Sequence, residues 1–370
     1  MIDTQLFSVE LPNGTTVRPL SGQVTIDETW SPFIQASIVI EEPADLTPFD
    51  PRLSPPPRVR VNAAQYFWNG TTGAFSVTPD SSESWNLHIR ESVRTADHTL
   101  TLTLASDEAL LQDYSQMFAT VGPGMDFVTF PSELHTVIDY VTHGPWGSLT
   151  SAGVVPTANF VETTPAVDLS PFNETVGLYT GIVWRPGVSA WSFVSEYLQR
   201  SGRRLWVDPD SDWHISLEPK NTAGTIYLHD AVQLTNYSST ISRDDWYDGV
   251  AIVYTWSPDA KYSPSLSHVD LATSGSFYRG RTHVETIQLA PAVGAATPAA
   301  AVFDGMATYK LDRMSALGRS ETFEAVSNFD AKTGMALSVS IDGGTVTGHV
   351  ASVTWNIGTR RMTVTGRDMV

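Results

Sequence analysis

The chain has 370 residues, of which 41% are hydrophobic and 10% aromatic, so we expect a packed globular protein with roughly two to four domains. Its formal net charge is −18, and no Lys or Arg lies between Arg94 and Arg185. Since binding to phosphates needs clustered cations, this composition argues against sequence-specific binding of nucleic acid. Simple solubility is the alternative explanation for the acidity.

Cysteine is absent, which excludes a disulfide framework, thiolate chemistry and a cysteine-based zinc site. The first residues, MIDTQLFSVELPNG, have neither the basic nor the apolar segment of a signal peptide. No apolar run approaches the ~20 residues that a membrane-spanning helix needs. We therefore expect a protein that is made and folded in a cytoplasm and has no membrane partner.

Residues 1–105 have the pattern of strands joined by turns. Two hairpins are predicted from Asn-Gly pairs, in LFSVELPNGTTVRPLSG and in QYFWNGTTGAFSV. The segment HTLTLTLAS, residues 98–106, alternates strictly between polar and apolar residues. A block of this length and pattern predicts an N-terminal tube-like β-barrel over residues 1–105.

One break interrupts this block, at Trp30-Ser31-Pro32 in SGQVTIDETWSPFIQASIVIEEP. Apolar and polar residues alternate on both sides of it. Because proline cannot donate a hydrogen bond to a sheet, it belongs at an edge, a corner or a bulge. The break therefore predicts a bend that joins two strands.

Residues 106–186 predict helices and a long loop. SDEALLQDYSQM is helical in pattern, with Ser106 as its cap, and PSELHTVIDYVTHG places Leu134, Ile138 and Val141 on one helix face with a stop at Gly144. Residues 145–185 are rich in Gly, Ser, Thr and Pro, so we expect an extended excursion at a contact surface.

Residues 187–240 predict a small helix–hairpin domain with α+β character. Trp191, Val194 and Leu198 fall at helical spacing, and Gly202 follows where a helix cap belongs. RLWV and HISL then flank an Asp-rich turn, so we expect a helix that packs on a hairpin over residues 204–217.

Residues 241–370 predict a second tube-like β-barrel. A strand is expected in DWYDGVAIVYTWS (245–257), and an inserted helix over about 297–318, with Thr297 as its cap, Pro298 in its first turn and Gly318 as its stop. Three closing strands follow, with a turn at 342–344. The order of strand, Gly-containing hairpin, strand and Thr-alternating strand repeats the order of the first block, from RVRV to HTLTLTLAS and from ALSVSI to RMTVTGR. The fold class is thus mainly β, with two related barrels around an α+β middle region.

Two patterns could bind metal ions. His135, Asp139 and His143 are spaced by four residues, which keeps them on one side of a helix, but a polar flank of an amphipathic helix explains them as well. The series Asp208-x-Asp210-x-Asp212 resembles the start of a calcium loop. It carries Trp213 where that loop needs Gly and Pro219 where it needs Glu, so we interpret it as a hairpin turn.

Motifs for catalysis are missing. The chain has no G-x-S-x-G, Walker, H-E-x-x-H or G-x-G-x-x-G pattern. The carboxylate pairs Glu41-Glu42 and Asp244-Asp245 are adjacent, so in a strand they point to opposite faces. We therefore assign no catalytic, cofactor-binding or metal-binding residue and expect a protein that is not an enzyme.

Eleven Trp residues stand out, and seven of them lie near predicted strand ends or loops. Trp is frequent at interaction hot spots and equally common in the cores of β-rich proteins, and we expect about half of these to be core residues. The seven are Trp30, Trp68, Trp85, Trp146, Trp184, Trp246 and Trp256.

Four segments together resemble the tail-tip or baseplate hub proteins of tailed bacteriophages, especially the minor tail proteins of phages that infect actinobacteria. They are SGQVTIDETWSPFIQASIVIEEP, DPRLSPPPRVRV, AWSFVSEYLQRSGRRLWVDPDSDWHISLEP and TVTGHVASVTWNIGTRRMTVTGRD. Each pattern is degenerate, but they occur in order and span most of the chain.

The resemblance implies a structural virion protein at the tail tip. Such hubs are homotrimers with two tube-like barrels per chain, so that a three-fold ring imitates the six-fold tail tube. Implied partners are the distal tail or tail tube protein, the tape measure protein and a receptor-binding or spike protein. Many hubs continue into a fibre or peptidase, whereas this sequence stops at Val370. Two alternatives stay open: a distal tail protein that forms a hexameric ring, and a tail-associated cell-wall hydrolase.

Overall fold

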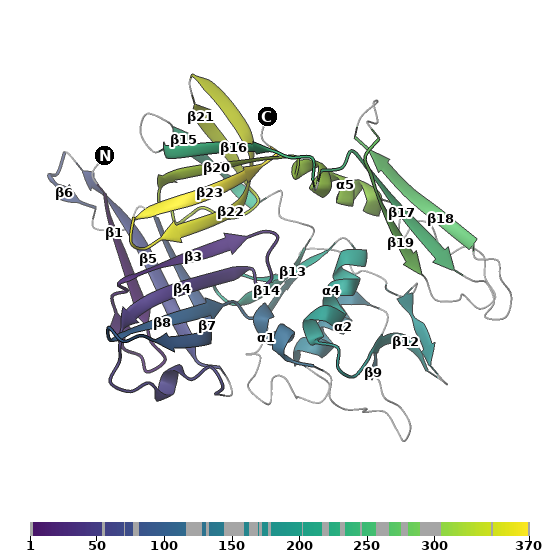
Figure 1. Cartoon of the computed structure of the whole chain (residues 1–370), viewed down its shortest axis with the longest axis horizontal. Helices are drawn as coiled ribbons and strands as arrows, with labels where there is room; N and C mark the ends of the chain where they lie inside the picture. The colour runs from purple at the N-terminus through teal and green to yellow at the C-terminus, as the bar shows by residue number, and fades with distance from the viewer. Residues whose placement is uncertain are drawn as a thin grey trace.

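The computed structural model describes most of the chain (Figure 1). The described residues exclude 1–2, 54–55, 70, 77–80, 116–127, 131–132, 144–158, 163–168, 170–171, 177–178, 202, 217–221, 230–233, 245, 257–265, 275–279, 289–304, 342 and 369–370. Strands greatly outnumber helices, which confirms the mainly β class predicted from the sequence.

Most strands belong to one 14-stranded sheet. Its first strands are β1 (Asp3–Glu10), β2 (Thr16–Val17), β3 (Ser21–Asp27), β4 (Ile34–Glu41), β5 (Arg58–Asn69), β6 (Ala74–Phe75), β7 (Ser81–Arg94) and β8 (Thr99–Ala105). Its later strands are β15 (Thr222–His229), β16 (Leu234–Ile241), β20 (Arg319–Val326), β21 (Met335–Ile341), β22 (Gly344–Asn356) and β23 (Arg361–Arg367).

This sheet contains two units with the same strand order. The N-terminal unit is ordered β3-β4-β8-β7-β5-β1, and the C-terminal unit is ordered β16-β20-β23-β22-β21-β15. Numbered along the chain within each unit, both orders read 2-3-6-5-4-1. One pairing differs, because β1 is antiparallel to β5 whereas β15 is parallel to β21. The predicted internal repeat is therefore confirmed at the level of strand order.

A β-bulge occurs at the same place in both units. The register between β7 and β8 shifts between Ile89 and Glu91, and the register between β22 and β23 shifts between Val350 and Ser352. Bulges are built-in features that bend a strand and increase its twist. A shared bulge in strand five of each unit sets the residue-by-residue correspondence between them.

The strand predicted at 245–257 does not join the C-terminal unit. Residues 249–256 form β17, which lies in a separate sheet ordered β18-β17-β19, and β15 and β16 take part in the C-terminal unit instead. The domain boundaries at 105, 186 and 240 stay a prediction.

Neither unit closes into a barrel through the strand pairs of the described residues. The outer strand β3 of the N-terminal unit pairs with β22 of the C-terminal unit, so the two expected barrels are one continuous open sheet. The physical reason is that β22, with 13 residues, outruns β21 and offers its second half to β3. Figure 1 shows the two groups of strands meeting along β3 and β22.

The rest of the chain forms a second layer of elements beside the sheet (Figure 1). After β8 come α1 (Glu108–Asp113), β9 (Val128–Phe130), α2 (Leu134–His143), β10 (Asn159–Glu162), β11 (Glu174–Val176), β12 (Tyr179–Trp184), α4 (Ala190–Arg200), β13 (Arg204–Val207) and β14 (Asp212–Ser216). Inserted between β16 and β20 are β17 (Gly249–Trp256), β18 (Leu266–Thr273), β19 (Thr282–Gln288) and α5 (Met306–Ala316). A short 3-10 helix covers Thr47–Phe49.

Two local predictions need correction, and a third falls partly outside the described residues. Residues 145–185, expected to be an extended loop, contain β10, β11 and β12, because short runs such as Tyr179–Trp184 find partner strands elsewhere. Ser106 does not cap α1, since its hydroxyl bonds to the backbone of Ile34. Helix α5 begins after Gly305, whose φ of 103° is left-handed, and the predicted start at 297–298 lies outside the described residues.

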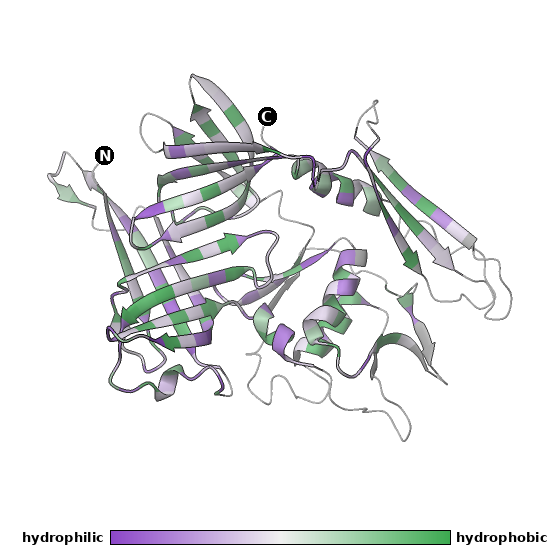
Figure 2. Ribbon diagram, viewed as in Figure 1, coloured by the Kyte–Doolittle hydropathy of each residue, from purple (hydrophilic) through white to green (hydrophobic). Residues whose placement is uncertain are grey.

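Two hydrophobic cores hold these layers. The first lies within the large sheet and combines side chains from both units, among them Trp85, Phe323 and Trp355. The second joins α1, α2, α4 and the hairpin β13–β14 to the inserted strands and α5, through residues such as Val194 and Tyr254. Figure 2 shows the alternation of apolar and polar residues along the strands that line the first core.

Candidate functional site

The contact between the two units, which we call the joint, is a short antiparallel ladder. Its register runs from Ser352 opposite Asp27 to Asn356 opposite Gln23. The hydroxyls of Thr25 and Thr354 lie 2.9 Å apart on one face. On the other face the neighbouring residues, including Trp355, are buried in the first core. The joint is therefore packed on one side and hydrogen-bonded on the other.

A charged cluster lies at one end of the joint. The Glu28 carboxylate accepts a hydrogen bond from Arg367 at 2.6 Å and lies 3.4 Å from His349 Nε2, while His349 Nδ1 lies 3.5 Å from Asp368. Burial alone lowers the pKa of His349, but hydrogen bonds with Asp368 and Glu28, and their negative charges, raise it to about 9. Near neutral pH this imidazole is therefore protonated and fastens the β3 end to the C-terminal unit.

The N-terminal unit has a histidine at the corresponding position. His88 and His349 each lie two residues before the bulged residue, so the repeat places them at equivalent sites. His88 Nδ1 is 3.7 Å from Asp107, whose carboxylate is held at 2.7 Å by Arg58. Burial lowers the pKa of His88, and the charges of Arg58 and Arg90 lower it further, against the opposing effect of Asp107. The pKa values of the two equivalent histidines are thus shifted in opposite directions.

The bend at Trp30-Ser31-Pro32 joins β3 to β4, as predicted. It also carries contacts between the sheet and the middle region. Gln112 donates to the Ser31 carbonyl at 2.9 Å, and Arg204 donates to the Asp27 carbonyl at 3.1 Å. The chain breaks its strand here because the bend is where α1 and β13 attach.

Glu108 ties the same three segments together from inside. Its Oε1 accepts hydrogen bonds from the backbone amides of Phe33, at 3.3 Å, and Val207, at 2.9 Å. Burial raises the pKa of this carboxyl to about 7, against the opposing effect of those hydrogen bonds. The side chain is a structural fastener in the interior, since its exposed fraction is 1%.

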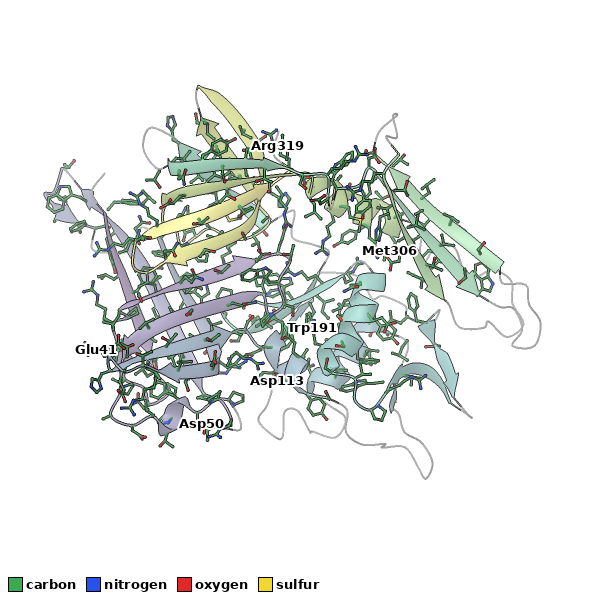
Figure 3. The ribbon with its side chains drawn as sticks, viewed as in Figure 1. Glu41, Asp50, Asp113, Trp191, Met306 and Arg319 are labelled. Carbon is green, nitrogen blue, oxygen red and sulfur yellow. The ribbon has the colours of Figure 1, made fainter. Side chains whose placement is uncertain are left out.

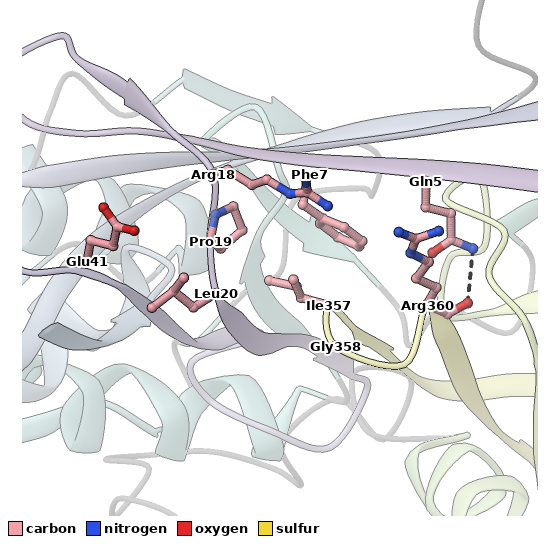
Figure 4. A pocket seen from close by; sticks show the side chains of 9 residues that line it. All are labelled: Gln5, Phe7, Arg18, Pro19, Leu20, Glu41, Ile357, Gly358 and Arg360. Atoms are coloured by element: carbon pink, nitrogen blue, oxygen red, sulfur yellow. Dashed lines mark hydrogen bonds between the residues drawn. The ribbon is translucent and has the colours of Figure 1, made fainter. Parts of the chain in front are cut away.

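A pocket of about 430 Å³ lies between β1, residues 18–20 just before β3, the end of β4 and the turn between β22 and β23 (Figure 4). Arg18, Arg360 and Glu41 are among its lining residues, and Gln5 donates to the Arg360 carbonyl at 3.0 Å. The lining has mixed charge and no convergent set of catalytic groups. We interpret this pocket as an opening at one end of the first hydrophobic core.

The three residues of the first candidate metal pattern, His135, Asp139 and His143, all lie on α2. His135 lies 3.0 Å from Glu133, Asp139 is exposed, and the side chain of His143 lies outside the described residues. Within the described part of the chain no three His, Asp or Glu side chains gather where they could hold a metal ion. The prediction of this site is therefore not tested at its third member.

The Asp-rich segment is a hairpin turn between β13 and β14, as predicted. The Asp208 carboxylate accepts from the amides of Asp210 and Asp212, both at 2.9 Å, and pairs with His214 at 2.9 Å. All of its oxygens are thereby engaged in shaping the turn.

The adjacent carboxylate pairs also have separate roles. Glu42 pairs with Arg94 at 2.6 Å and with His98 at 3.2 Å, whereas Glu41 lies at the pocket. Asp244 offers its carbonyl to Arg281, and Asp245 lies outside the described residues. Glu41 and Glu42 are therefore not arranged around a common substrate position, and the arrangement of the second pair lies outside the described residues.

The seven singled-out Trp residues divide between core and surface. Three are buried, namely Trp85, Trp184 and Trp256, and Trp30 and Trp68 are 43% and 42% exposed. Trp246 is half-buried, and Trp146 lies outside the described residues. The expectation that about half are core residues is confirmed.

Sequence reasoning missed the joint and its histidines. The signal was present in NLHIRES, residues 86–92, and TGHVASV, residues 347–353, which align once the repeat is set at the bulge. Only the three-dimensional register shows that β3 pairs with β22.

No protein-family model matches the chain, and no curated protein matches it in sequence. Solved structures do match it over nearly its whole length. A tail protein from Neisseria meningitidis MC58 gives a TM-score of 0.61 at 12% identity, covering 98% of this chain and 96% of that one. A prophage MuSo2 tail protein from Shewanella oneidensis gives 0.57 at 11% identity, with 98% of each chain covered. A prophage tail protein from Listeria monocytogenes EGD-e gives 0.51 at 9% identity, covering 98% and 94%.

At these identities the matches establish a shared fold. They confirm the resemblance to phage tail proteins that the sequence patterns indicate. No helix in the described residues is long and apolar enough to cross a membrane. The chain has the fold of phage and prophage tail proteins.

Proposed function

We propose that this protein is a structural hub at the tail tip or baseplate of a phage-type particle. The observation that carries the proposal is the presence of two units of the same strand order in one chain, joined edge to edge. A chain with two equivalent units lets three copies present six similar positions. A three-fold ring of such chains can therefore dock onto a six-fold tube.

The remaining elements fit a protein that contacts several neighbours. The middle region and the inserted strands share a core of their own, so they project as a second body beside the sheet. In the proposal, the sheet faces the distal tail or tail tube protein and the tape measure protein. The second body is then placed to contact a receptor-binding or spike protein.

The proposal assigns no catalysis to the chain. Two of its buried titratable groups, Glu108 and His349, are engaged in contacts between segments rather than aimed at an open cavity. A peptidoglycan zymogram tests this point. A clear lytic band from the purified chain would contradict the structural role and favour a tail-associated hydrolase.

The proposal also concerns the wall of the central channel. With a net charge of −18 per chain, carboxylates are expected to outnumber Lys and Arg on the surface that lines the three-fold axis. A basic wall would hold exiting DNA by releasing its counterions. A structure of the assembled ring with more Lys and Arg than Asp and Glu along the axis would reject this point.

Stoichiometry tests the hub assignment itself. Three copies per tail, counted by quantitative mass spectrometry of purified particles against a tail component of known copy number, are expected for the hub. Six copies would contradict it and favour the distal tail protein.

A further inference from the structure

Several strand edges have no partner among the described residues, and two of them belong to β16 and to the C-terminal part of β7. Strand β16 ends the sheet, pairing only with β20, and its Tyr237 and Ile241 are 42% and 81% exposed. Strand β7 pairs with β5 up to His88, and beyond it residues 91–94 pair only with β8. In Figure 1 these two edges lie at opposite ends of the series β16-β20-β23-β22-β3-β4-β8-β7.

In the repeat, these two open edges are equivalent to the two strand edges that pair with each other at the joint. Strand β16 corresponds to β3, because both flank strand three of their unit, and β7 corresponds to β22, because both carry the bulge. The backbone repeats this correspondence in a further detail. Asp27 N donates to Phe33 O in one unit, and Ser242 N donates to Gly318 O at the same place in the other.

We infer that β16 of one chain pairs with residues 91–95 of β7 and its turn in a second copy of this chain, repeating the joint between chains. This inference rests on the proposed function, since it supplies the contact that a ring of copies needs. A contact between two different edges is head-to-tail, and it closes into a ring when its rotation permits. The ladder then continues around the ring with eight strands from each chain.

The joint also fixes the register of the new contact. Within the joint Thr354 lies opposite Thr25 and Val353 opposite Ile26. Aligning the two bulges makes Val93 equivalent to Thr354 and Ser92 equivalent to Val353. Aligning β4 with β20 makes Thr240 equivalent to Thr25 and Ile241 equivalent to Ile26. In the new contact Val93 is therefore opposite Thr240, and Ser92 is opposite Ile241. The contact would cover Ile241.

Hydrogen-bonding directions agree with this register. At the joint, Glu28 N donates to Ala351 O and Ile357 N donates to Gly22 O, so Val24 and its even-numbered neighbours point their backbone groups at β22. By the same alternation, Ser239 and Ile241 point their backbone groups at the free edge. Ser242 N donates to Gly318 O on the β20 side, as expected because even-numbered residues of this strand point their backbone groups at β20.

The composition of β16 supports an occupied edge. Natural edge strands that must stay unpaired carry Lys, Pro or other charged residues that block pairing. The strand LTNYSSTI has eight residues with no charge and no Pro. A strand of this kind is suited to a partner strand.

Cysteine pairs test the register directly, because the natural chain has no cysteine. Val93 and Thr240 correspond to Thr354 and Thr25, whose hydroxyls are 2.9 Å apart, so their Cβ atoms should be close enough for a disulfide. Val93→Cys with Thr240→Cys, oxidised and run without reductant, is expected to give covalent dimers and trimers. Thr25→Cys with Thr354→Cys is the matched control, expected to link within one chain. Val93→Cys with Ser239→Cys, on opposite faces, should give no ladder.

The outcomes separate this inference from the proposed function. A wild-type trimer without a ladder from Val93→Cys with Thr240→Cys would overturn the register and leave the hub standing. A ladder that continues past three chains would support the pairing and contradict the trimer. A monomer with no ladder would contradict both.

A second variant asks whether the free edge is needed for assembly. Ser239→Pro removes a backbone donor that points away from β20, so the isolated chain should keep its melting temperature while losing its trimer mass. Thr240→Pro removes a donor that points toward β20 and should lower the melting temperature as well. Unchanged assembly of folded Ser239→Pro would overturn the inference.

Discussion

The two sheet units share a strand order and a bulge, yet their equivalent positions have different surroundings. Strand β3 has its outer edge covered by β22, and its Val24 and Ile26 are buried; the equivalent β16 is exposed along nearly its whole length. The outer edge of β3 therefore has its partner strand within the chain, whereas the equivalent edge of β16 has none among the described residues. The β3–β22 contact within one chain is thus the template for the inferred contact between β16 and β7 of two chains.

The equivalent histidines show the same contrast in charge. His349 lies between two carboxylates, which raise its pKa, whereas His88 shares one carboxylate with Arg58 and its pKa is lowered by burial. The repeat therefore preserves the backbone arrangement of the two units, whereas the charged residues around it differ. Each unit can therefore adapt its end to a different neighbour.

The largest effect is expected from the core that both units share. Trp355 is fully buried and its ring centroid lies 5.1 Å from that of Trp85 of the other unit. Trp355→Ala should lower the free energy of unfolding by about 3–5 kcal/mol, because it leaves a large cavity. Chemical denaturation followed by fluorescence measures the change. A loss below about 1 kcal/mol would show that the units are not packed on each other.

The next effect sharpens the difference between the two histidines. A folded pKa of about 9 for His349, above the usual 6.5, gives stability that is complete below pH 6.5 and lost as pH rises through 9. The pKa difference corresponds to about 3 kcal/mol. His349→Gln should remove most of that slope. His88, with its lowered pKa, should instead lose stability as pH falls below 6.5, so His88→Gln should leave the slope between pH 6.5 and 9 unchanged.

A smaller effect is expected at Glu108, which ties only the N-terminal unit to the middle region. Its folded pKa of about 7 exceeds the ordinary 4.5, so the folded chain loses stability as pH rises from 4.5 to 7. Glu108→Gln keeps an acceptor for Val207 and removes the charge, so it should raise stability at pH 8 by about 1–2 kcal/mol. Thermal melts at pH 5 and pH 8 measure it. A variant that is less stable at pH 8 would contradict this assignment.

The smallest effect is expected at Trp191. It was predicted to be a core residue of the helix–hairpin packing, but it is only half-buried at the start of α4 (Figure 3), beside the buried Phe193 and Val194. Trp191→Ala should therefore cost about 1–2 kcal/mol rather than the larger loss of a buried Trp. Val194→Ala is the matched control on the buried face. A larger loss from Trp191 than from Val194 would restore the original prediction.

Much of the fold could be predicted because its signals are local. Alternation, Asn-Gly turns and the break at Trp30-Ser31-Pro32 depend on neighbouring residues, and they mark β1 to β8 well. The repeat was visible because both units close with a Thr-alternating strand. The buried face of helix α2 could be predicted from the spacing of Leu134, Ile138 and Val141, which are all buried.

The rest depends on contacts between distant segments. Nothing near Ser352 in the sequence indicates that Asp27 lies opposite it, and nothing near Thr222 indicates a parallel partner at Met335. For this reason the separate sheet of β17 and the open form of the large sheet were not predicted. The joint histidines became visible only after the register was known.

The most direct test of the account is an image of the assembled protein down its axis, averaged without imposed symmetry and paired with its mass in solution. The account predicts a ring of six similar lobes of two alternating kinds, with a mass of about three times the 40.3 kDa of one chain. A ring of six identical lobes with the mass of six chains would contradict it.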